Sequence, residues 1–150
     1  MITSQDKSEF ELDESPLAKV SPGAELVGAI ENWSFPVLFR SGVVIFNLGD
    51  RPDHMYFVKS GEVVLTMPVT GGGEWTVRAG EGSILGLPAI MGNEPYSLTA
   101  TVSRDSLICR ISRENFHQLM QENPGVCCNV LQILASEVLA ARSALSRLLG

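Results

Sequence analysis

The chain has 150 residues, which is the size of one ordinary domain. With 45% hydrophobic and 19% charged residues, its composition is typical of a packed globular protein. The formal net charge of −6 at pH 7 repels phosphate backbones, so we expect no direct binding of nucleic acid by this chain.

The N-terminal stretch is polar and acidic, and it reads MITSQDKSEFELDESP. It lacks the basic start and the apolar core of a signal peptide. No apolar run approaches the roughly 20 residues that span a bilayer. We therefore expect a soluble, cytoplasmic protein that does not bind membranes, with residues 1–14 forming a polar tail.

Two helix-start signals follow the tail, at Ser15-Pro16 and at Ser21-Pro22. In each, a serine is placed at the N-cap and a proline at the first helical position, where its missing N–H removes no hydrogen bond. Apolar residues then recur at helical spacing as far as Phe35-Pro36. The sequence predicts a helix here with an apolar face made of Leu26, Val27, Ile30 and Trp33.

Between Leu38 and Ile111 the pattern changes to short apolar runs separated by Gly, Asp, Pro and Asn. Turn signals fall about every 8–12 residues and several runs alternate, which favours a β-sandwich, a jelly roll or a small barrel. Two hairpin turns are predicted in particular. One is Lys59-Ser60-Gly61-Glu62, and the other is the GGG stretch at 71–73.

After Ile111 the pattern becomes helical. Ser112 is placed to cap a short helix, and Asn123-Pro124 repeats the cap-plus-proline signal. The face of the short helix carries Phe116, Leu119 and Met120.

A final helix from Pro124 to Leu149 would be about 39 Å long at 1.5 Å per residue, which exceeds one face of a small roll. Its apolar residues follow an a/d heptad pattern without a break. We therefore predict that part of this helix forms a homodimer interface. The seam consists of Cys127, Leu131, Leu134, Val138, Ala141, Leu145 and Leu148.

The cysteines and histidines do not form a catalytic or metal-binding pattern. Cys109, Cys127 and Cys128 lack disulfide or metal spacing, so we expect buried, reduced thiols, with a redox role for Cys127 and Cys128 across a dimer as the alternative. We expect His54 at a solvent-facing strand start. Since His54 and His117 lie on separate segments, they cannot supply the converging ligands of a metal-dependent roll enzyme. We expect no enzyme activity, no metal and no cofactor.

The order of these features resembles the regulatory domain of the CRP/FNR family and other cyclic-nucleotide-binding domains, over roughly residues 20–149. The matching segments are FRSGVVIFNLGD, MYFVKSGEVVL, RAGEGSILGLPAIMGNEPYSLTATV and ISRENFHQLMQENPGV. The resemblance implies a mainly β fold with flanking helices, namely a double-stranded β-helix or jelly roll followed by a long dimerisation helix. We divide the chain into the tail (1–14), the roll with its N-terminal helices (15–123) and the C-terminal helix (124–150).

One stretch matches the phosphate-binding cassette of the family. Nucleotide-binding members resemble F-G-E-L-A-L-x-x-x-x-P-R-A-A-T-V there, where the Glu binds the ribose hydroxyl and the Arg pairs with the phosphate. Gly86 and Pro95 match at the same separation, whereas Leu87 stands at the Glu position and Tyr96 at the Arg position. Pro88 also removes a backbone donor. We therefore expect no binding of ordinary cyclic AMP or cyclic GMP.

The cassette positions that we expect to line a ligand pocket are Gly86, Leu87, Pro88, Ala89, Tyr96, Ser97 and Thr99. Hydroxyl groups of the last three and an apolar wall of Leu87 and Ile90 suit another small molecule. The alternative is a collapsed pocket that these side chains fill. Arg78 and Arg104 are nearby cations, but the sequence places neither in the pocket.

The leading hypothesis is a non-enzymatic, homodimeric sensor with an unidentified small-molecule effector, which shifts the long helix relative to that of its dimer mate. Two alternatives stay open: a cyclic-nucleotide receptor with a rewired pocket, and a ligand-free dimerisation or partner-docking domain. Regulators of the resembled family carry a helix-turn-helix domain after the long helix, and this chain has no room for one. It is therefore expected to be a stand-alone sensor or a fragment of a longer transcription regulator.

Overall fold

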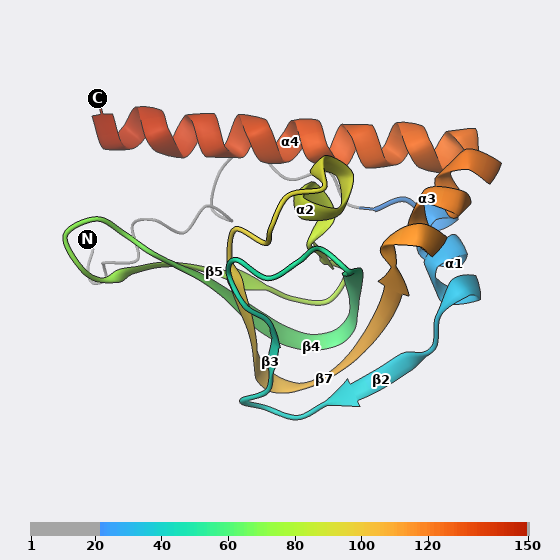
Figure 1. Ribbon diagram of the computed structural model, residues 1–150, viewed down its shortest axis with the longest axis horizontal. Helices are drawn as coiled ribbons and strands as arrows, with labels where there is room; N and C mark the ends of the chain where they lie inside the picture. The colour runs from blue at the N-terminus through green and yellow to red at the C-terminus, as the bar shows by residue number, and fades with distance from the viewer. Residues whose placement is uncertain (1–21, 150) are drawn as a thin grey trace.

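The computed structural model describes residues 22–149, with side chains up to residue 137. Helix α1 (Ala24–Trp33) precedes a β-roll, and α3 (Arg113–Glu122) and α4 (Pro124–Leu149) follow it. Figure 1 shows α4 lying along one side of the roll, with α1 and α3 at one end of it. The strands are β2 (Pro36–Phe39), β3 (Val44–Phe46), β4 (His54–Pro68), β5 (Glu74–Ala79), β6 (Ile84–Leu85) and β7 (Thr99–Ser112), with α2 (Leu87–Gly92) after β6.

The described strands pair in an antiparallel manner in the order β2-β7-β4-β5, while β3 also pairs with β7 and β6 with β4. The two long strands, β4 and β7, pair from His54 opposite Ser112 to Thr66 opposite Thr99. Because both strands bend, each contributes to both halves of the roll (Figure 1). The predicted fold class, a jelly roll with flanking helices and a long C-terminal helix, is confirmed.

The predicted hairpin at Lys59–Glu62 was wrong, because β4 runs through these residues as one strand. The β4–β7 register shifts on both sides of Gly61, which has φ +104°. A Cβ atom on Gly61 would lie 2.6 Å from the Cα atom of Ser106 on β7. A turn-like sequence therefore produces a β-bulge that bends the strand without reversing it. The second predicted turn, at 71–73, does connect β4 to β5.

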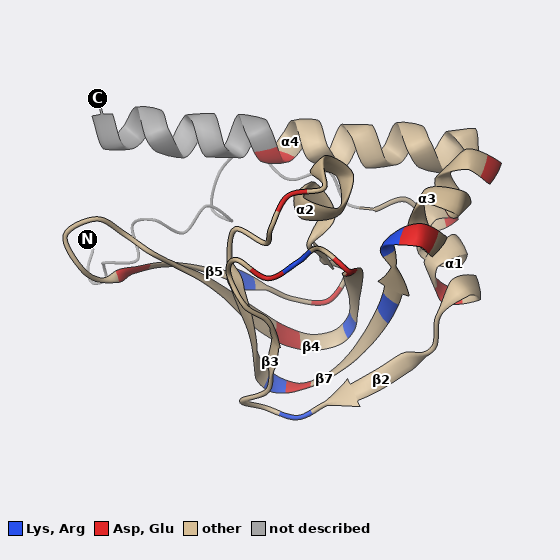
Figure 2. Ribbon diagram, in the orientation of Figure 1, with Lys and Arg blue, Asp and Glu red and all other residues tan. Residues whose placement is uncertain are grey.

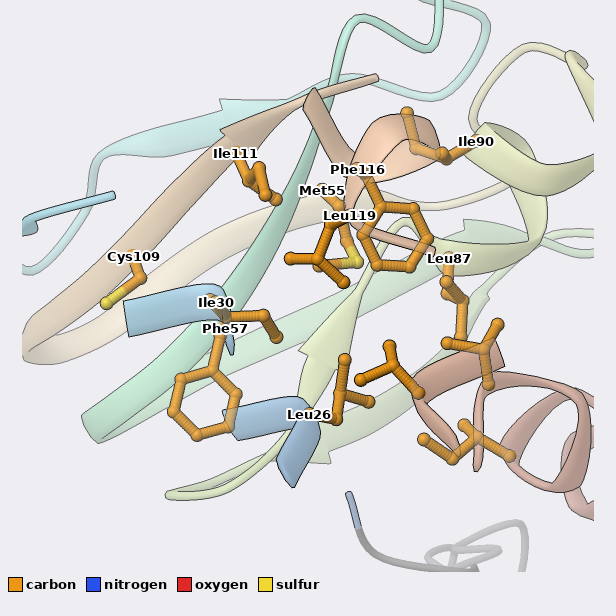
Figure 3. Close-up of a cluster of buried hydrophobic side chains, with 13 residues drawn as sticks. Leu26, Ile30, Met55, Phe57, Leu87, Ile90, Cys109, Ile111, Phe116 and Leu119 are labelled. Carbon is orange, nitrogen blue, oxygen red and sulfur yellow. The ribbon is translucent and has the colours of Figure 1, made fainter. Parts of the chain in front are cut away.

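Two apolar clusters hold the elements together. One lies inside the roll and includes Phe46, Tyr56 and Tyr96. The other joins the sheet to all four helices (Figure 3), and it contains Leu26, Ile30, Met55, Phe57, Leu87, Ile90, Cys109, Ile111, Phe116, Leu119, Val126, Val130 and Ile133. Burial of these side chains stabilises the fold by about 25 cal/mol for each Å² of apolar surface removed from water.

The helix starts agree with the sequence signals in part. Helix α1 begins at Ala24 with Gly23 as its N-cap, two residues after the predicted Ser21-Pro22 signal. The backbone N–H of Gly23 donates to the Asn129 side chain of α4 (2.7 Å), so a tertiary contact satisfies this end of the helix. The earlier signal, Ser15-Pro16, lies outside the described residues.

Helices α3 and α4 begin where the sequence predicts. The Ser112 hydroxyl accepts a hydrogen bond from the Asn115 N–H (3.1 Å), and α4 starts at Pro124. No helix within residues 22–149 is both long enough and apolar enough to span a bilayer.

The face of α4 that packs on the roll is not the predicted seam. The fully or almost fully buried positions within its described part are Val126, Val130, Ile133 and Ser136. Of the seam residues, Leu131 is 57% exposed, Cys127 is half-buried, and Leu134 is half-buried against the core. The seam side chains Val138, Ala141, Leu145 and Leu148 lie outside the part of the chain whose side chains are described.

The prediction of buried thiols is correct only for Cys109, whose pKa is raised by burial. Cys127 is half-buried and Cys128 is exposed, because α4 turns the preceding residue, Val126, toward the roll.

The Gly61 bulge leads to a stability test. Gly61 and Gly72 share φ +104°, but a Cβ atom on Gly72 meets nothing within 4 Å. We expect Gly72→Ala to cost about 1–2 kcal/mol of unfolding free energy from backbone strain. Gly61→Ala should cost a further ~1–3 kcal/mol from the clash with β7. Urea unfolding of both variants measures the difference, and equal costs would contradict the close approach of β4 and β7.

Candidate functional site

A cavity of about 410 Å³ lies between the roll and α4, a size typical of small-molecule sites. Its walls come from β5, the turn into β6, the cassette and one face of α4. From α4 the lining residues are Ile133, Ser136 and Glu137, so the long helix directly contacts the space.

The cassette begins as a strand, a turn and a short helix, namely β6, Gly86 and α2. Gly86 is the N-cap of α2 with φ +84°, and it turns the chain from β6 into the helix. A Cβ atom there would lie 3.0 Å from Cε1 of Tyr96, so both the backbone angle and the neighbouring ring favour glycine. Asn93, with φ 52°, ends the helix.

The structure brings five of the seven predicted pocket residues to the cavity: Gly86, Pro88, Ala89, Tyr96 and Ser97. It does not bring the other two there. Leu87 is fully buried in the cluster between the sheet and the helices, as is Ile90, so neither forms a wall of the cavity. The Thr99 hydroxyl accepts a hydrogen bond from the Leu48 N–H (3.0 Å) in the loop that precedes β4.

Tyr96, at the position of the family's arginine, is buried and fully engaged. Its hydroxyl donates to the His54 carbonyl and accepts from the His54 N–H (3.2 Å). Its ring stacks on Phe46 with 3.9 Å between ring centroids. Burial raises the pKa of Tyr96, so the side chain stays neutral. A paired, uncharged phenol therefore stands where the resemblance places a phosphate-pairing arginine.

The backbone of Tyr96 is also fixed. Its N–H donates to the Asp50 carbonyl (3.0 Å), and its carbonyl accepts from the Gly49 N–H (2.8 Å). The end of the cassette is thus attached to the 47–53 loop by main-chain as well as side-chain hydrogen bonds.

Of the two arginines considered from the sequence, Arg78 lines the cavity and Arg104 does not. Arg78 Nη1 lies 3.0 Å from Glu62 Oε1, and Arg104 donates to the Gly61 carbonyl (3.3 Å). The pKa of Glu62 is lowered, first by a hydrogen bond from the Ser103 hydroxyl and then by the two arginines. Figure 2 shows both charge signs scattered over the described roll, so the charge at the cavity depends on such local pairs.

A second hollow of about 350 Å³ shares Phe46 and Tyr96 with the cavity. Its lining includes Asp50, Asp53 and His54. The pKa of His54 is lowered by burial and, to a smaller extent, by the charge of Arg110. Within the described residues, no three His, Cys, Asp or Glu side chains gather in a way that could hold a metal ion.

Sequence reasoning missed the contribution of β5 and of α4 to the cavity. Trp75, Val77 and Ala79 alternate along β5 and all line it. On α4, Val130, Ile133 and Glu137 repeat at intervals of three and four residues, parallel to the predicted seam. These periods are visible in the sequence, but the seam gave the stronger apolar signal and concealed the second stripe.

The chain is a β-roll with a cavity under its long C-terminal helix, and the family comparison identifies its kind. A family model described as "Cyclic nucleotide-binding domain" matches residues 36–123, more than half of the chain. The chain belongs to the cyclic nucleotide-binding domain family.

Individual relatives are distant. "Lysophospholipase nte1" of Aspergillus terreus is 28% identical over 103 residues, covering 68% of this chain and 7% of that protein. The catabolite activator protein of Thermus thermophilus has a TM-score of 0.75 and 26% identity, covering 91% of this chain and 62% of that one. The regulator CLP of Xanthomonas campestris has a TM-score of 0.71 and 20% identity, covering 84% and 64%. The chain spans less than a tenth of the curated relative and under two thirds of either regulator.

The Tyr96 hydroxyl offers a direct stability test. Tyr96→Phe leaves both backbone groups of His54 without their partner, so we expect a loss of about 1–3 kcal/mol in unfolding free energy. Tyr56→Phe is the matched control, since this equally buried tyrosine has no hydroxyl hydrogen bond recorded within the described residues. Denaturant unfolding of the two variants measures the difference. If Tyr96→Phe lowers the free energy of unfolding no more than Tyr56→Phe does, the stabilising role of the Tyr96–His54 hydrogen bonds is contradicted.

Proposed function

We propose that this domain is a non-enzymatic sensor in which the cavity under α4 holds a small effector other than cyclic AMP or cyclic GMP. The observation that carries the proposal is Tyr96. At the position where binding members of the resembled family place a phosphate-pairing arginine, the chain has a neutral side chain whose hydroxyl is already paired.

The energetics support this choice. Charge-assisted hydrogen bonds contribute about 1.5–3 kcal/mol each. Losing the Glu and Arg anchors together therefore weakens nucleotide binding on the order of 10²–10⁴-fold. Leu87 adds to the effect, because a carboxylate in its place would be buried in the main core and desolvated.

The relatives support a change of effector within one fold. The structure of CLP is described as that of a c-di-GMP-responsive global regulator, so a protein with a similar fold responds to a nucleotide other than cyclic AMP or cyclic GMP. In the lysophospholipase the matching part is a small share of a long chain. Because the two bacterial regulators match both the roll and most of this chain's length, we favour transcription regulation as the output.

Helix α4 is the element that we propose transmits the signal. It contacts the cavity through Ile133, Ser136 and Glu137 and the core through Val126 and Val130. An effector that changes the packing under this face favours one position of the helix over another.

We further propose a homodimer through the heptad seam of α4. Leu131, a seam position, is 57% exposed on the helix, so its side chain is available to a mate helix that packs against the seam. With a mate helix against this seam, a shift of α4 becomes a change at the dimer interface.

A second candidate, a cyclic-nucleotide receptor with a rewired pocket, is favoured by one observation: Arg78 lines the cavity. Its pairing with Glu62 weighs against it. The third candidate, a ligand-free docking domain, is weakened by the cavity of about 410 Å³, since a collapsed pocket would be filled by its own side chains.

Calorimetric titration with cyclic AMP and cyclic GMP tests the effector proposal. We expect no appreciable heat for either nucleotide at concentrations that saturate micromolar sites, because both phosphate and ribose anchors are replaced. Micromolar affinity would contradict the proposal, and its loss in Arg78→Gln would establish the rewired receptor instead.

Light scattering tests the dimer. Leu131→Lys places an ammonium group in the seam, which costs several kcal/mol if the position is buried by a mate, so we expect a monomer where the unmodified chain is a dimer. Gln132→Lys adds the same charge at the next exposed position, off the seam, and should leave the dimer intact. A monomeric unmodified chain, or an unchanged mass for Leu131→Lys, would contradict the interface.

A further inference from the structure

We propose that the effector of the α4 cavity is an uncharged aromatic molecule. This inference rests on the proposed function and gives its ligand a chemical class. Two observations support it: the composition of the cavity wall, and the pairing of Arg78, the one described cation of the lining, with Glu62.

The wall is mainly apolar and carries an aromatic side chain. Trp75 and Val77 face the space from β5, Leu85 and Leu98 from the cassette side, and Ile133 from α4. Trp75 is only half-buried, so part of its ring surface stays available to a ligand. Aromatic rings in contact stabilise each other beyond the burial of their area, which favours a flat, aromatic occupant.

The charged groups of the wall do not favour an anion. Arg78 is the only described Lys or Arg that lines the cavity, and its Nη1 is already 3.0 Å from Glu62 Oε1. Glu81 and Glu137 add two carboxylates to the same lining. A phosphate, sulfonate or carboxylate that enters here loses its hydration beside carboxylates of the same charge. It also has to compete with Glu62 for the guanidinium of Arg78.

Neutral hydrogen-bonding groups complete the wall. Ser83 and Ser97 belong to the lining, and a serine hydroxyl accepts or donates a hydrogen bond without a net charge. They suit a small polar substituent on an apolar ring, which is the usual balance of a small-molecule site.

Two fluorescent probes that share one ring system and differ in charge separate the effect of ligand charge on binding from the effect of ligand shape. N-phenyl-1-naphthylamine is uncharged, and 8-anilinonaphthalene-1-sulfonate carries the same rings with a sulfonate. The chain has two tryptophans, so Trp33→Phe leaves Trp75 as the sole donor for energy transfer to a probe in this cavity. We expect saturable transfer from Trp75 to the neutral probe, with a Kd at least ten times lower than for the sulfonate.

Matched variants locate the probe and test the charge argument. In the unmodified chain, Trp75→Ala should weaken binding of the neutral probe at least fivefold, while Thr76→Ala, the next residue on β5 and outside the lining, should leave it unchanged. Glu62→Gln frees the Arg78 guanidinium. It should tighten binding of the sulfonate severalfold and leave the neutral probe unaffected.

Three results would overturn the inference: no saturable transfer from Trp75, an affinity for the sulfonate equal to or tighter than that for the neutral probe, or an unchanged neutral-probe affinity in Trp75→Ala. Preference for the sulfonate with transfer from Trp75 would refute the ligand class and leave the cavity as the effector site. Micromolar binding of a cyclic nucleotide refutes the proposed function separately, so the two failures are distinguishable.

Discussion

The close approach of β4 to β7 at Gly61 is the constraint on which the rest of the structure depends. There the Ser106 hydroxyl accepts from the Glu62 N–H (3.0 Å) and donates to the Arg104 carbonyl (2.6 Å), and Ser106 itself is almost fully buried. These bonds satisfy backbone groups that the bulge takes out of the regular ladder. Because the long strands bend together at this point, one pair of strands forms both halves of the roll, and the cavity exists between β5, the cassette and α4.

Tyr96 relates the structure of the roll to the nature of its ligand, because it lies between the cassette and β4. In a phosphate-binding pocket, the residue at this position has to keep its charge available to a ligand. Here the side chain is used within the protein: it joins the end of the cassette to the start of β4 and stacks on Phe46. The hydrogen bonds between Tyr96 and His54 fix the cassette without a bound nucleotide. An arginine that pairs with a ligand could not do this, because its buried charge would be unpaired when the ligand is absent. Under the proposed function, one residue difference at this position thus removes a phosphate-binding group and adds a structural one.

The sequence predicted more of the fold than of the site, for physical reasons. Turn residues, caps such as Ser112 and the Pro124 start act locally, so the roll and the helix order were accessible from short segments. The hairpin at Gly61 failed because only the distant Ser106 distinguishes a bulge from a turn. Leu87 was expected at the pocket, but the rotation of a six-residue helix depends on the packing of α4 and the sheet around it. Arg78 reaches the cavity through strand pairing across the roll, which no local pattern encodes.

The buried and exposed positions of α4 explain how one helix could serve both the roll and the proposed dimer mate. Val126, Val130 and Ile133 are buried on the roll, while Leu131 on the same turns remains exposed. Because these positions share the same turns of one helix, a change of contacts at Ile133 in the cavity cannot rotate the helix without also moving Leu131. An uncharged aromatic ligand acts in such a system through packing alone, since it brings no charge to be neutralised. Under the proposed function, the input is then the volume and shape of what lies between Trp75 and Ile133, and the output is the angle at which Leu131 is presented.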